Sequence, residues 1–110
     1  MTLINWIVLC ITMLVQPPQV KRVVDGDTFI LYNVGVTDEE RIRLLGVDAA
    51  ELRDSLGPAA RTFTEQWLVR GPFIISGCKR DSFGRILAEV TRGTDTLASE
   101  LIRLKLGVPR

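Results

Sequence analysis

The stretch from Arg41 to Glu51 constrains the fold more than any other part of the sequence, because it joins a strand-like segment to a turn that carries two carboxylates. Along a regular strand, side chains alternate between the two faces, so Arg43 and Asp48 would face opposite ways. Gly46 lies between them, and a glycine inside a strand often marks a bulge or a sharp bend. We therefore expect a bend at Gly46 that brings both carboxylates back towards Arg43.

The composition limits the chemistry available to the chain. Its 110 residues suit one domain with a modest core. The net charge of +1 gives no overall attraction for polyanions, so any affinity for nucleic acid must come from local basic clusters. The sequence contains no histidine, which excludes histidine zinc sites, Ser-His-Asp triads and a histidine general base. Carboxylate, arginine and metal chemistry remain.

The amino-terminal residues 1–16 carry no charged side chain and include an apolar run from Trp6 to Val15. This run is short for a transmembrane helix, which needs ~20 apolar residues, and suits the core of a secretory signal, typically ~7–15 residues. No basic residue precedes it and no small-residue cleavage site follows before Pro17-Pro18, so an extra buried strand or helix is the alternative. We predict a signal-like or anchor segment at residues 1–18 and a folded domain at residues 19–110.

This division carries further expectations. The protein would be secreted or periplasmic, or tethered to a membrane through residues 1–16, with a cytoplasmic location still open. The domain should fold without residues 1–16. Cys10 and Cys78 do not have zinc-site spacing, and removal of the amino terminus would leave Cys78 without an intramolecular disulfide partner.

Short apolar segments between turn signals predict the element order β-β-β-α-β-β-α. The expected strands are Gln19–Asp25, Thr28–Tyr32, Arg41–Val47, Phe73–Ser76 and Arg85–Thr91, with an exposed hairpin loop at Asn33–Glu40. Five strands with a helix between the third and fourth indicate a mainly β fold with two helices, a five-stranded OB-fold-like Greek-key barrel.

Helical spacing supplies the two helices of this order. The first begins near Pro58, a favoured first-turn residue, and its expected buried stripe is Leu56, Ala60, Phe63 and Trp67. The second is capped by Thr94, Asp95 or Thr96 and ends at Gly107, with an inner face of Leu97, Leu101 and Leu104. The helical stripe favours a core role for the aromatic residues over base stacking.

Four blocks of sequence carry a resemblance to a known family. They are Val24-Asp25-Gly26-Asp27-Thr28, Arg41 to Glu51, Gly57-Pro58-Ala59-Ala60 and Asp81-Ser82-Phe83-Gly84-Arg85. In their order and spacing they resemble the staphylococcal-nuclease-like (thermonuclease) family, over Gln19 to Gly107. The resemblance implies an OB-type barrel, in agreement with the element order.

The resemblance also implies roles for individual residues. Ca²⁺ would bind Asp27, Asp48 and the backbone carbonyl of Ala49, since calcium prefers hard oxygen ligands. Glu51 would be the general base that accepts a proton from the attacking water. Arg43 and Arg85 would be catalytic, because planar guanidinium groups bind phosphate oxygens and stabilise charge that develops at phosphorus.

Each of these residues also has a purely structural interpretation. Asp27 would be a turn residue, Asp48 a cap and Glu51 a solvated loop residue. Arg43 would pair with the acidic loop across the sheet, and Arg85 would be a surface arginine after a tight turn.

Two departures from the family pattern weaken the expected substrate contacts. Ala49-Ala50 stands where the family commonly has Thr-Pro, which keeps the carbonyl but loses the hydroxyl and the stiff proline. Ser82-Phe83 stands where a Lys-Tyr pair often contacts the substrate phosphate.

The sequence thus predicts a Ca²⁺-dependent nuclease that hydrolyses DNA and RNA with little sequence preference and leaves 3′-phosphates. We expect a monomer without an obligate protein partner. The alternatives are an OB-type module that binds single strands without cutting them, and a membrane-tethered structural protein in which the apolar run is the functional part.

Overall fold

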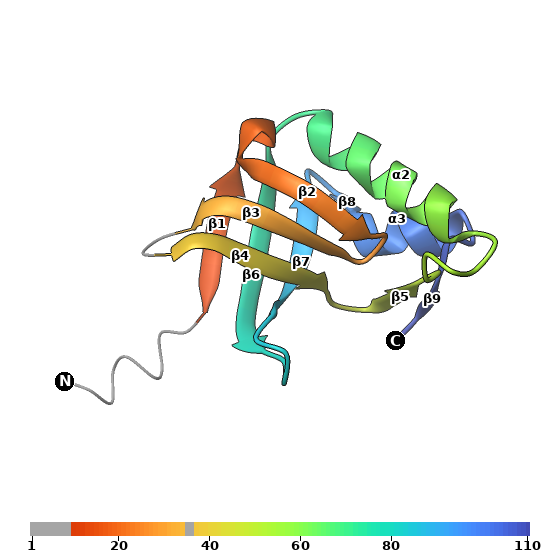
Figure 1. The fold of residues 1–110 in the computed structure, drawn as a ribbon. Helices are drawn as coiled ribbons and strands as arrows, with labels where there is room; N and C mark the ends of the chain where they lie inside the picture. The colour runs from red at the N-terminus through yellow and green to blue at the C-terminus, as the bar shows by residue number, and fades with distance from the viewer. Residues whose placement is uncertain (1–9, 35–36) are drawn as a thin grey trace.

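The strands pair into one large sheet and one small one, as the computed structural model shows for residues 10–34 and 37–110 (Figure 1). The large sheet contains β1 (Ile11–Val15), β2 (Val20–Asp25), β3 (Thr28–Val34), β4 (Thr37–Leu44), β6 (Phe73–Arg80), β7 (Ile86–Arg92) and β8 (Asp95–Thr96). The small sheet pairs β5 (Val47–Ala49) with β9 (Gly107–Pro109). Helices α2 (Gly57–Val69) and α3 (Leu97–Arg103) and the 3-10 helix η1 (Pro17–Gln19) complete the described chain.

The order of the large sheet is β1-β6-β7-β4-β3-β2, with β8 beside β7. The β4–β7 pair is parallel and the other pairs are antiparallel. The two ends of this path, β1 and β2, follow each other along the chain through η1, and no pairing joins them among the described residues. The predicted class, mainly β with two helices, is confirmed; an OB-like arrangement is consistent with this order, although the barrel is not closed.

Strand β1 adds to the sheet before the predicted start of the domain at residue 19. It pairs antiparallel with β6, from Ile11 opposite Gly77 to Val15 opposite Phe73. Val15 is fully buried in the core, so the sheet of the folded domain includes residues on both sides of the predicted boundary. The prediction of a signal-like segment otherwise falls on residues 1–9, which lie outside the described residues. No helix in the described ranges is long and apolar enough to cross a membrane.

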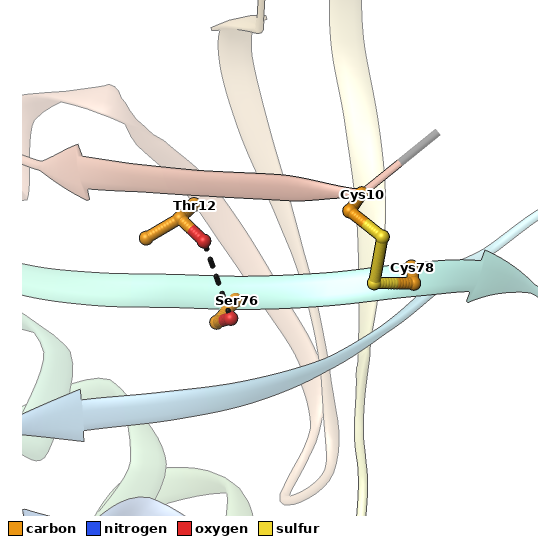
Figure 2. Close-up of a disulfide and its surroundings, with 4 residues drawn as sticks. All are labelled: Cys10, Thr12, Ser76 and Cys78. Atoms are coloured by element: carbon orange, nitrogen blue, oxygen red, sulfur yellow. Dashed lines mark hydrogen bonds between the residues drawn. A yellow bond between two sulfur atoms is a disulfide. The ribbon is translucent and has the colours of Figure 1, made fainter. Parts of the chain in front are cut away.

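A disulfide joins Cys10, which directly precedes β1, to Cys78 in β6 (Figure 2). Both cysteines are exposed, and on the same face the hydroxyl groups of Thr12 and Ser76 lie 3.3 Å apart in a hydrogen bond. Cys78 therefore has an intramolecular partner in the chain that includes residue 10, and β1 is fixed covalently to β6.

The acidic run that was expected in a hairpin loop lies within a strand. Strand β4 begins at Thr37, and Glu39 and Glu40 pair with residues of β3. Their side chains form ion pairs with Lys21 and Arg80. Because these partners neutralise the acidic side chains at the sheet surface, the run extends the strand instead of ending it.

Helix α2 packs its two aromatic residues, Phe63 and Trp67, against the core. Trp67 is almost fully buried, with its ring centroid 6.1 Å from that of Phe73. Phe63 is partly buried against the same core, so the prediction that both aromatics are core residues is confirmed. Leu56, in contrast, is exposed; it precedes the first helical residue, and Thr64 lies buried on the inner face instead.

Helix α3 begins as predicted but ends earlier. The Thr96 hydroxyl accepts a hydrogen bond from the Ser99 N–H, a standard N-cap. The helix ends at Arg103 instead of Gly107, so Leu104 is 39% exposed while Leu101 is buried. The residues that follow form β9, which returns alongside β5 and shapes the candidate site.

Candidate active site

The turn between β2 and β3 carries two aspartates and packs tightly against α2. The buried Thr64 hydroxyl donates a hydrogen bond of 2.6 Å to the Gly26 carbonyl. A Cβ atom at Gly26 would lie 2.8 Å from the Cβ of Ala49 and 2.9 Å from the Cβ of Ala60. Only glycine fits so close an approach, so helix α2 and strand β5 together fix the position of the turn.

The bend expected between Arg43 and Asp48 is present. Gly46 has a φ of +85° between the end of β4 and the start of β5. The Arg43 guanidinium donates to the Leu44 and Val47 carbonyls at 2.9 and 2.8 Å, and also to the Asp48 carboxylate. Arg43 is buried, and the bend therefore brings a charged side chain and its carboxylate partner to one point.

Asp27 completes this partly buried charge cluster. One carboxylate oxygen accepts the Ala49 N–H at 2.8 Å and lies 3.5 Å from the Arg43 guanidinium, and the other accepts the Thr28 hydroxyl at 3.0 Å. Arg43 thus lies between two carboxylates, those of Asp27 and Asp48. The proposed pairing of Arg43 with the acidic run is wrong, because that run pairs with Lys21 and Arg80.

Asp25, at the other end of the same turn, was not among the predicted site residues. Its carboxylate accepts the Asp27 N–H at 3.1 Å. Burial is the largest cause that raises the pKa of Asp25, to about 6, and the side-chain hydrogen bond with Asp27 and the repulsion from its carboxylate act in the same direction. The hydrogen bond from the Asp27 N–H and the charge of Arg43 lower this pKa, but they do not outweigh the other causes. The carboxylates of Asp25 and Asp27 therefore repel each other when both are ionised beside the buried Arg43 guanidinium. A bound cation would reduce this repulsion.

Glu51 lies at the rim of the site, in the loop before α2. A Cβ atom at Gly57 would lie 1.9 Å from the Glu51 carbonyl oxygen, so the start of the helix holds this loop at close range. The Glu51 carboxylate is 62% exposed and lies 2.8 Å from the Arg53 guanidinium. Exposed ion pairs of this kind are weak, so the carboxylate can turn towards the site at little cost.

Arg85 reaches the site from the start of β7. Its Nε donates to the Asp81 carboxylate at 2.7 Å, and its guanidinium lies 5.3 Å from the ring centroid of Phe83. Burial alone would raise the pKa of Asp81, but hydrogen bonds from Arg85 and Phe83 together lower it. Asp81 thus stays ionised and orients Arg85, which is only 25% exposed and is not a free surface arginine.

One cavity of about 430 Å³ joins these groups. Its lining residues are Asp25, Asp27, Arg43, Asp48, Ala49, Glu51, Arg85 and Arg110. All six residues predicted from the sequence line it. The two that were missed differ in kind: Asp25 belongs to a block already recognised, whereas the position of Arg110 depends on the long-range pairing of β9 with β5, which no local signal announces.

A second cavity of about 310 Å³ adjoins the first and shares its three arginines. Phe83, which replaces the polar residue of the family pattern, lines this second cavity and is 77% exposed. The two cavities together give a polar pocket beside a partly apolar one.

The donor set of the first cavity suits a calcium ion in its chemistry. Asp27, Asp48 and the Ala49 carbonyl offer hard oxygen atoms, and the chain has no histidine to favour a softer metal. Among residues 10–34 and 37–110, no three acidic or cysteine side chains approach closely enough to hold a metal ion by themselves. Backbone carbonyl and water ligands would have to complete the coordination.

The sequence is similar to that of a thermonuclease from Staphylococcus intermedius. The two are 35% identical over an alignment of 92 residues that covers 76% of this chain and 54% of the relative. The chain thus spans about half the length of the relative it matches. No profile of a known protein family matches the chain. The similarity supports a thermonuclease-like relationship.

Proposed function

We propose that the protein is a Ca²⁺-dependent nuclease that hydrolyses the phosphodiester bonds of DNA and RNA with little sequence preference and leaves 3′-phosphates. The observation that carries this proposal is the convergence of the six predicted residues on one cavity. They come from three segments of the chain, at Asp27, at residues 43–51 and at Arg85. A chance collection of turn and surface residues would have no reason to meet there. The similarity to a thermonuclease supports the same reaction class.

Two arginines are placed to stabilise the negative charge that develops at phosphorus during the reaction. Arg43 is held by two carbonyls and two carboxylates, so its guanidinium is preorganised before substrate arrives. Arg85 is held in the same way by Asp81. Preorganised donors that face the developing charge lower the barrier because they need no reorganisation during the reaction. We assign both arginines to the non-bridging oxygens of the phosphate that is cleaved.

Glu51 is the group that we assign to the attacking water. Its carboxylate is exposed at the cavity rim and is restrained only by the weak pair with Arg53. After turning towards the phosphate it would accept a proton from water as the new bond to phosphorus forms. The bond from phosphorus to the 5′ oxygen of the next nucleotide then breaks, and this oxygen takes a proton from solvent. The phosphate stays on the 3′ oxygen of the preceding nucleotide.

Calcium would be held by Asp27, Asp48 and the Ala49 carbonyl. When bound, it would neutralise phosphate charge and polarise the bond that is attacked. Asp27 and Asp48 also orient Arg43, so the same carboxylates serve the metal and the arginine.

The test is cleavage of single-stranded DNA by the full chain, with Ca²⁺ and with excess chelator. We expect activity only with Ca²⁺, and a rise in melting temperature on its addition, because a ligand that binds only the folded state stabilises it. Asp27→Asn keeps the shape of the side chain and removes its charge, and should abolish both effects. Asp95→Asn, at an exposed position outside the cavity, is the matched control. Unchanged cleavage in chelator would contradict the metal requirement.

A binding module without catalytic activity is the alternative. The second cavity is the observation that favours it, because the exposed aromatic ring of Phe83 beside arginines suits base stacking. Such a module would bind the same DNA without cutting it, with or without Ca²⁺. The cleavage assay above separates the two functions.

An exported location is part of the proposal. Disulfides persist mainly in oxidising compartments, and the Cys10–Cys78 bond is exposed to solvent, where a reducing cytoplasm would have access to it. A secreted or periplasmic monomer that degrades nucleic acid fits these observations. Detection of the protein in culture medium or periplasmic extract, against a cytoplasmic marker, tests the location.

A further inference from the structure

Arg110 is held at the site by the backbone of the strand that carries Asp48. Strand β9 pairs with β5 from Gly107 opposite Ala49 to Pro109 opposite Val47. The Arg110 N–H then donates a hydrogen bond of 3.1 Å to the Gly46 carbonyl, at the bend itself. The backbone of Arg110 is therefore fixed beside the site, and its side chain starts from a defined position.

The Arg110 guanidinium is the most exposed of the three that line the cavities. Its side chain is 62% exposed, against 6% for Arg43 and 25% for Arg85. It contacts the Asp48 carboxylate at 3.2 Å, on the same oxygen that Arg43 binds. Asp48 is thus shared by two cations, and Arg110 is the more exposed of the two.

The position of Arg110 differs from that of the other two arginines in a way that suits a different phosphate. All three arginines line both cavities and pair with carboxylates, but Arg43 and Arg85 are largely buried, whereas the Arg110 side chain is mostly exposed. A polynucleotide that places one phosphate against Arg43 and Arg85 must continue out of the pocket. Its next phosphate would pass the exposed rim, where Arg110 offers a planar fork of donors.

We propose that Arg110 binds a phosphate that flanks the cleaved one and so sets the affinity for polynucleotides without taking part in the bond change. This inference rests on the proposed nuclease function for its substrate. The competing interpretation is that Arg110 only holds Asp48 in place.

The experiment compares the full chain with Arg110→Gln on two substrates. A dinucleotide has a single phosphodiester and no flanking phosphate, whereas a ten-nucleotide single strand has several. We expect Arg110→Gln to raise the KM for the longer strand about tenfold relative to that for the dinucleotide, as for the loss of one charge-assisted hydrogen bond. Because Arg110 also contacts Asp48, any effect on kcat should be small and the same for both substrates. If Arg110 only positioned Asp48, both substrates would be affected equally and kcat would fall.

Salt dependence provides a second readout, independent of cleavage. Binding of the longer strand in chelator should weaken with salt, with a slope of log K against log salt that is smaller by about 0.7 in Arg110→Gln, the share of one phosphate contact on a single strand. Arg110→Lys should restore the slope. Arg103→Gln is the matched control, because Arg103 is 64% exposed and ion-paired but lines neither cavity.

The outcomes separate this inference from the proposed function. If the protein binds the strand but cuts nothing, and Arg110→Gln alone reduces the salt slope, the nuclease proposal fails and the Arg110 proposal stands. Equal binding and equal slopes for both proteins overturn the Arg110 proposal, with or without cleavage. A protein that neither binds nor cuts overturns both.

Discussion

The candidate active site and the β1–β6 edge are held together by opposite kinds of interaction. At the site, Asp27, Arg43 and Asp48 form a partly buried cluster of charges that also involves Arg110. At the β1–β6 edge, a disulfide, a hydroxyl hydrogen bond and buried apolar side chains such as Val15 join the two strands. In Figure 1, β1 and the β5–β9 pair lie at different sides of the molecule.

This difference indicates how the chain divides stability and function. Burying charges costs desolvation energy that their mutual attraction only partly returns, so the cluster around Arg43 is a poor source of stability and a good source of preorganised chemistry. The β1–β6 edge carries no such cost. We infer that the covalent and apolar contacts at the β1–β6 edge offset the desolvation free energy of the charged site. The four predictions below test that division.

The largest effect is expected from removal of residues 1–16. This deletion takes away fully buried Val15, the inward-facing Ile11 and Met13, and the whole pairing with β6. A fully buried side chain such as Val15 contributes about 1.5–3 kcal/mol, and the partly buried Ile11 and Met13 contribute less each. Together with the lost strand pairing, this removes much of the stability of a small domain. We expect no cooperative urea transition, followed by near-UV circular dichroism. Removal of residues 1–9 alone, which keeps every described contact, is the control.

A deletion variant with the parental unfolding midpoint would show that β1 is dispensable. It would also restore the expectation, drawn from the sequence, that the domain folds without residues 1–16. The same variant should be assayed for cleavage, because activity without β1 would separate the site completely from the edge.

Arg43→Lys should have the next largest effect, and it acts on the site alone. Lysine keeps the charge but replaces a planar fork that serves the Leu44 and Val47 carbonyls and two carboxylates at once. Turnover should fall ~10²–10³-fold, about 3–4 kcal/mol in the barrier, as for loss of one preorganised donor. Single-turnover cleavage and equilibrium binding on one oligonucleotide measure it, with Arg103→Lys as control. Equal, small losses in both would favour the binding module.

Loss of the disulfide should weaken the edge and leave the chemistry intact. The bond closes a loop with a sequence separation of 68 residues, and a link of that length stabilises by about 2–4 kcal/mol, chiefly by restricting the unfolded chain. The double variant Cys10→Ser, Cys78→Ser should lose that much in urea unfolding without reductant. Its turnover at 25 °C should match the parent, since neither cysteine lines the cavities. A parallel loss of turnover would show that edge and site are coupled.

Much of the site could be predicted because its signals are local. The Asp-Gly-Asp turn, the glycine bend and the Asp81–Arg85 turn each occupy a few consecutive residues, and their types limit what they can do. Asp25 belonged to one of these turns, but nothing in the turn alone shows that burial and the neighbouring Asp27 raise its pKa.

What could not be predicted depends on contacts between distant segments. The apolar run before Pro17-Pro18 has the composition of a signal core and also of a buried strand, and only pairing with β6 separates the two for Ile11–Val15. The β5–β9 pair is equally non-local, so no local pattern in the sequence marks Arg110 as a site residue. The early end of α3 was missed for another reason: Lys105, with a φ of 60°, occupies a position where glycine is usual.

Lys105→Gly should give the smallest change in stability. It tests both parts of the comparison, because the turn at Lys105 ends α3 and leads into β9, which carries the chain to Arg110 at the site. Lys105 follows the last turn of α3, where its N–H bonds to the Ile102 carbonyl and the Leu106 N–H bonds to the Leu101 carbonyl, the pattern of a Schellman cap. A left-handed φ costs a lysine roughly 1 kcal/mol that glycine avoids. The greater freedom of glycine in the unfolded chain offsets part of this, so a net gain of about 0.5 kcal/mol is expected in urea unfolding. Leu104→Gly, one residue earlier and at an ordinary φ of −84°, is the control and should destabilise.

Because the cap sets where β9 begins, and with it the position of Arg110, turnover and KM should stay at parental values if the cap geometry is kept. A stabilised variant with an altered KM would instead show that the cap geometry shifts and that the site and its supporting turn cannot be improved separately.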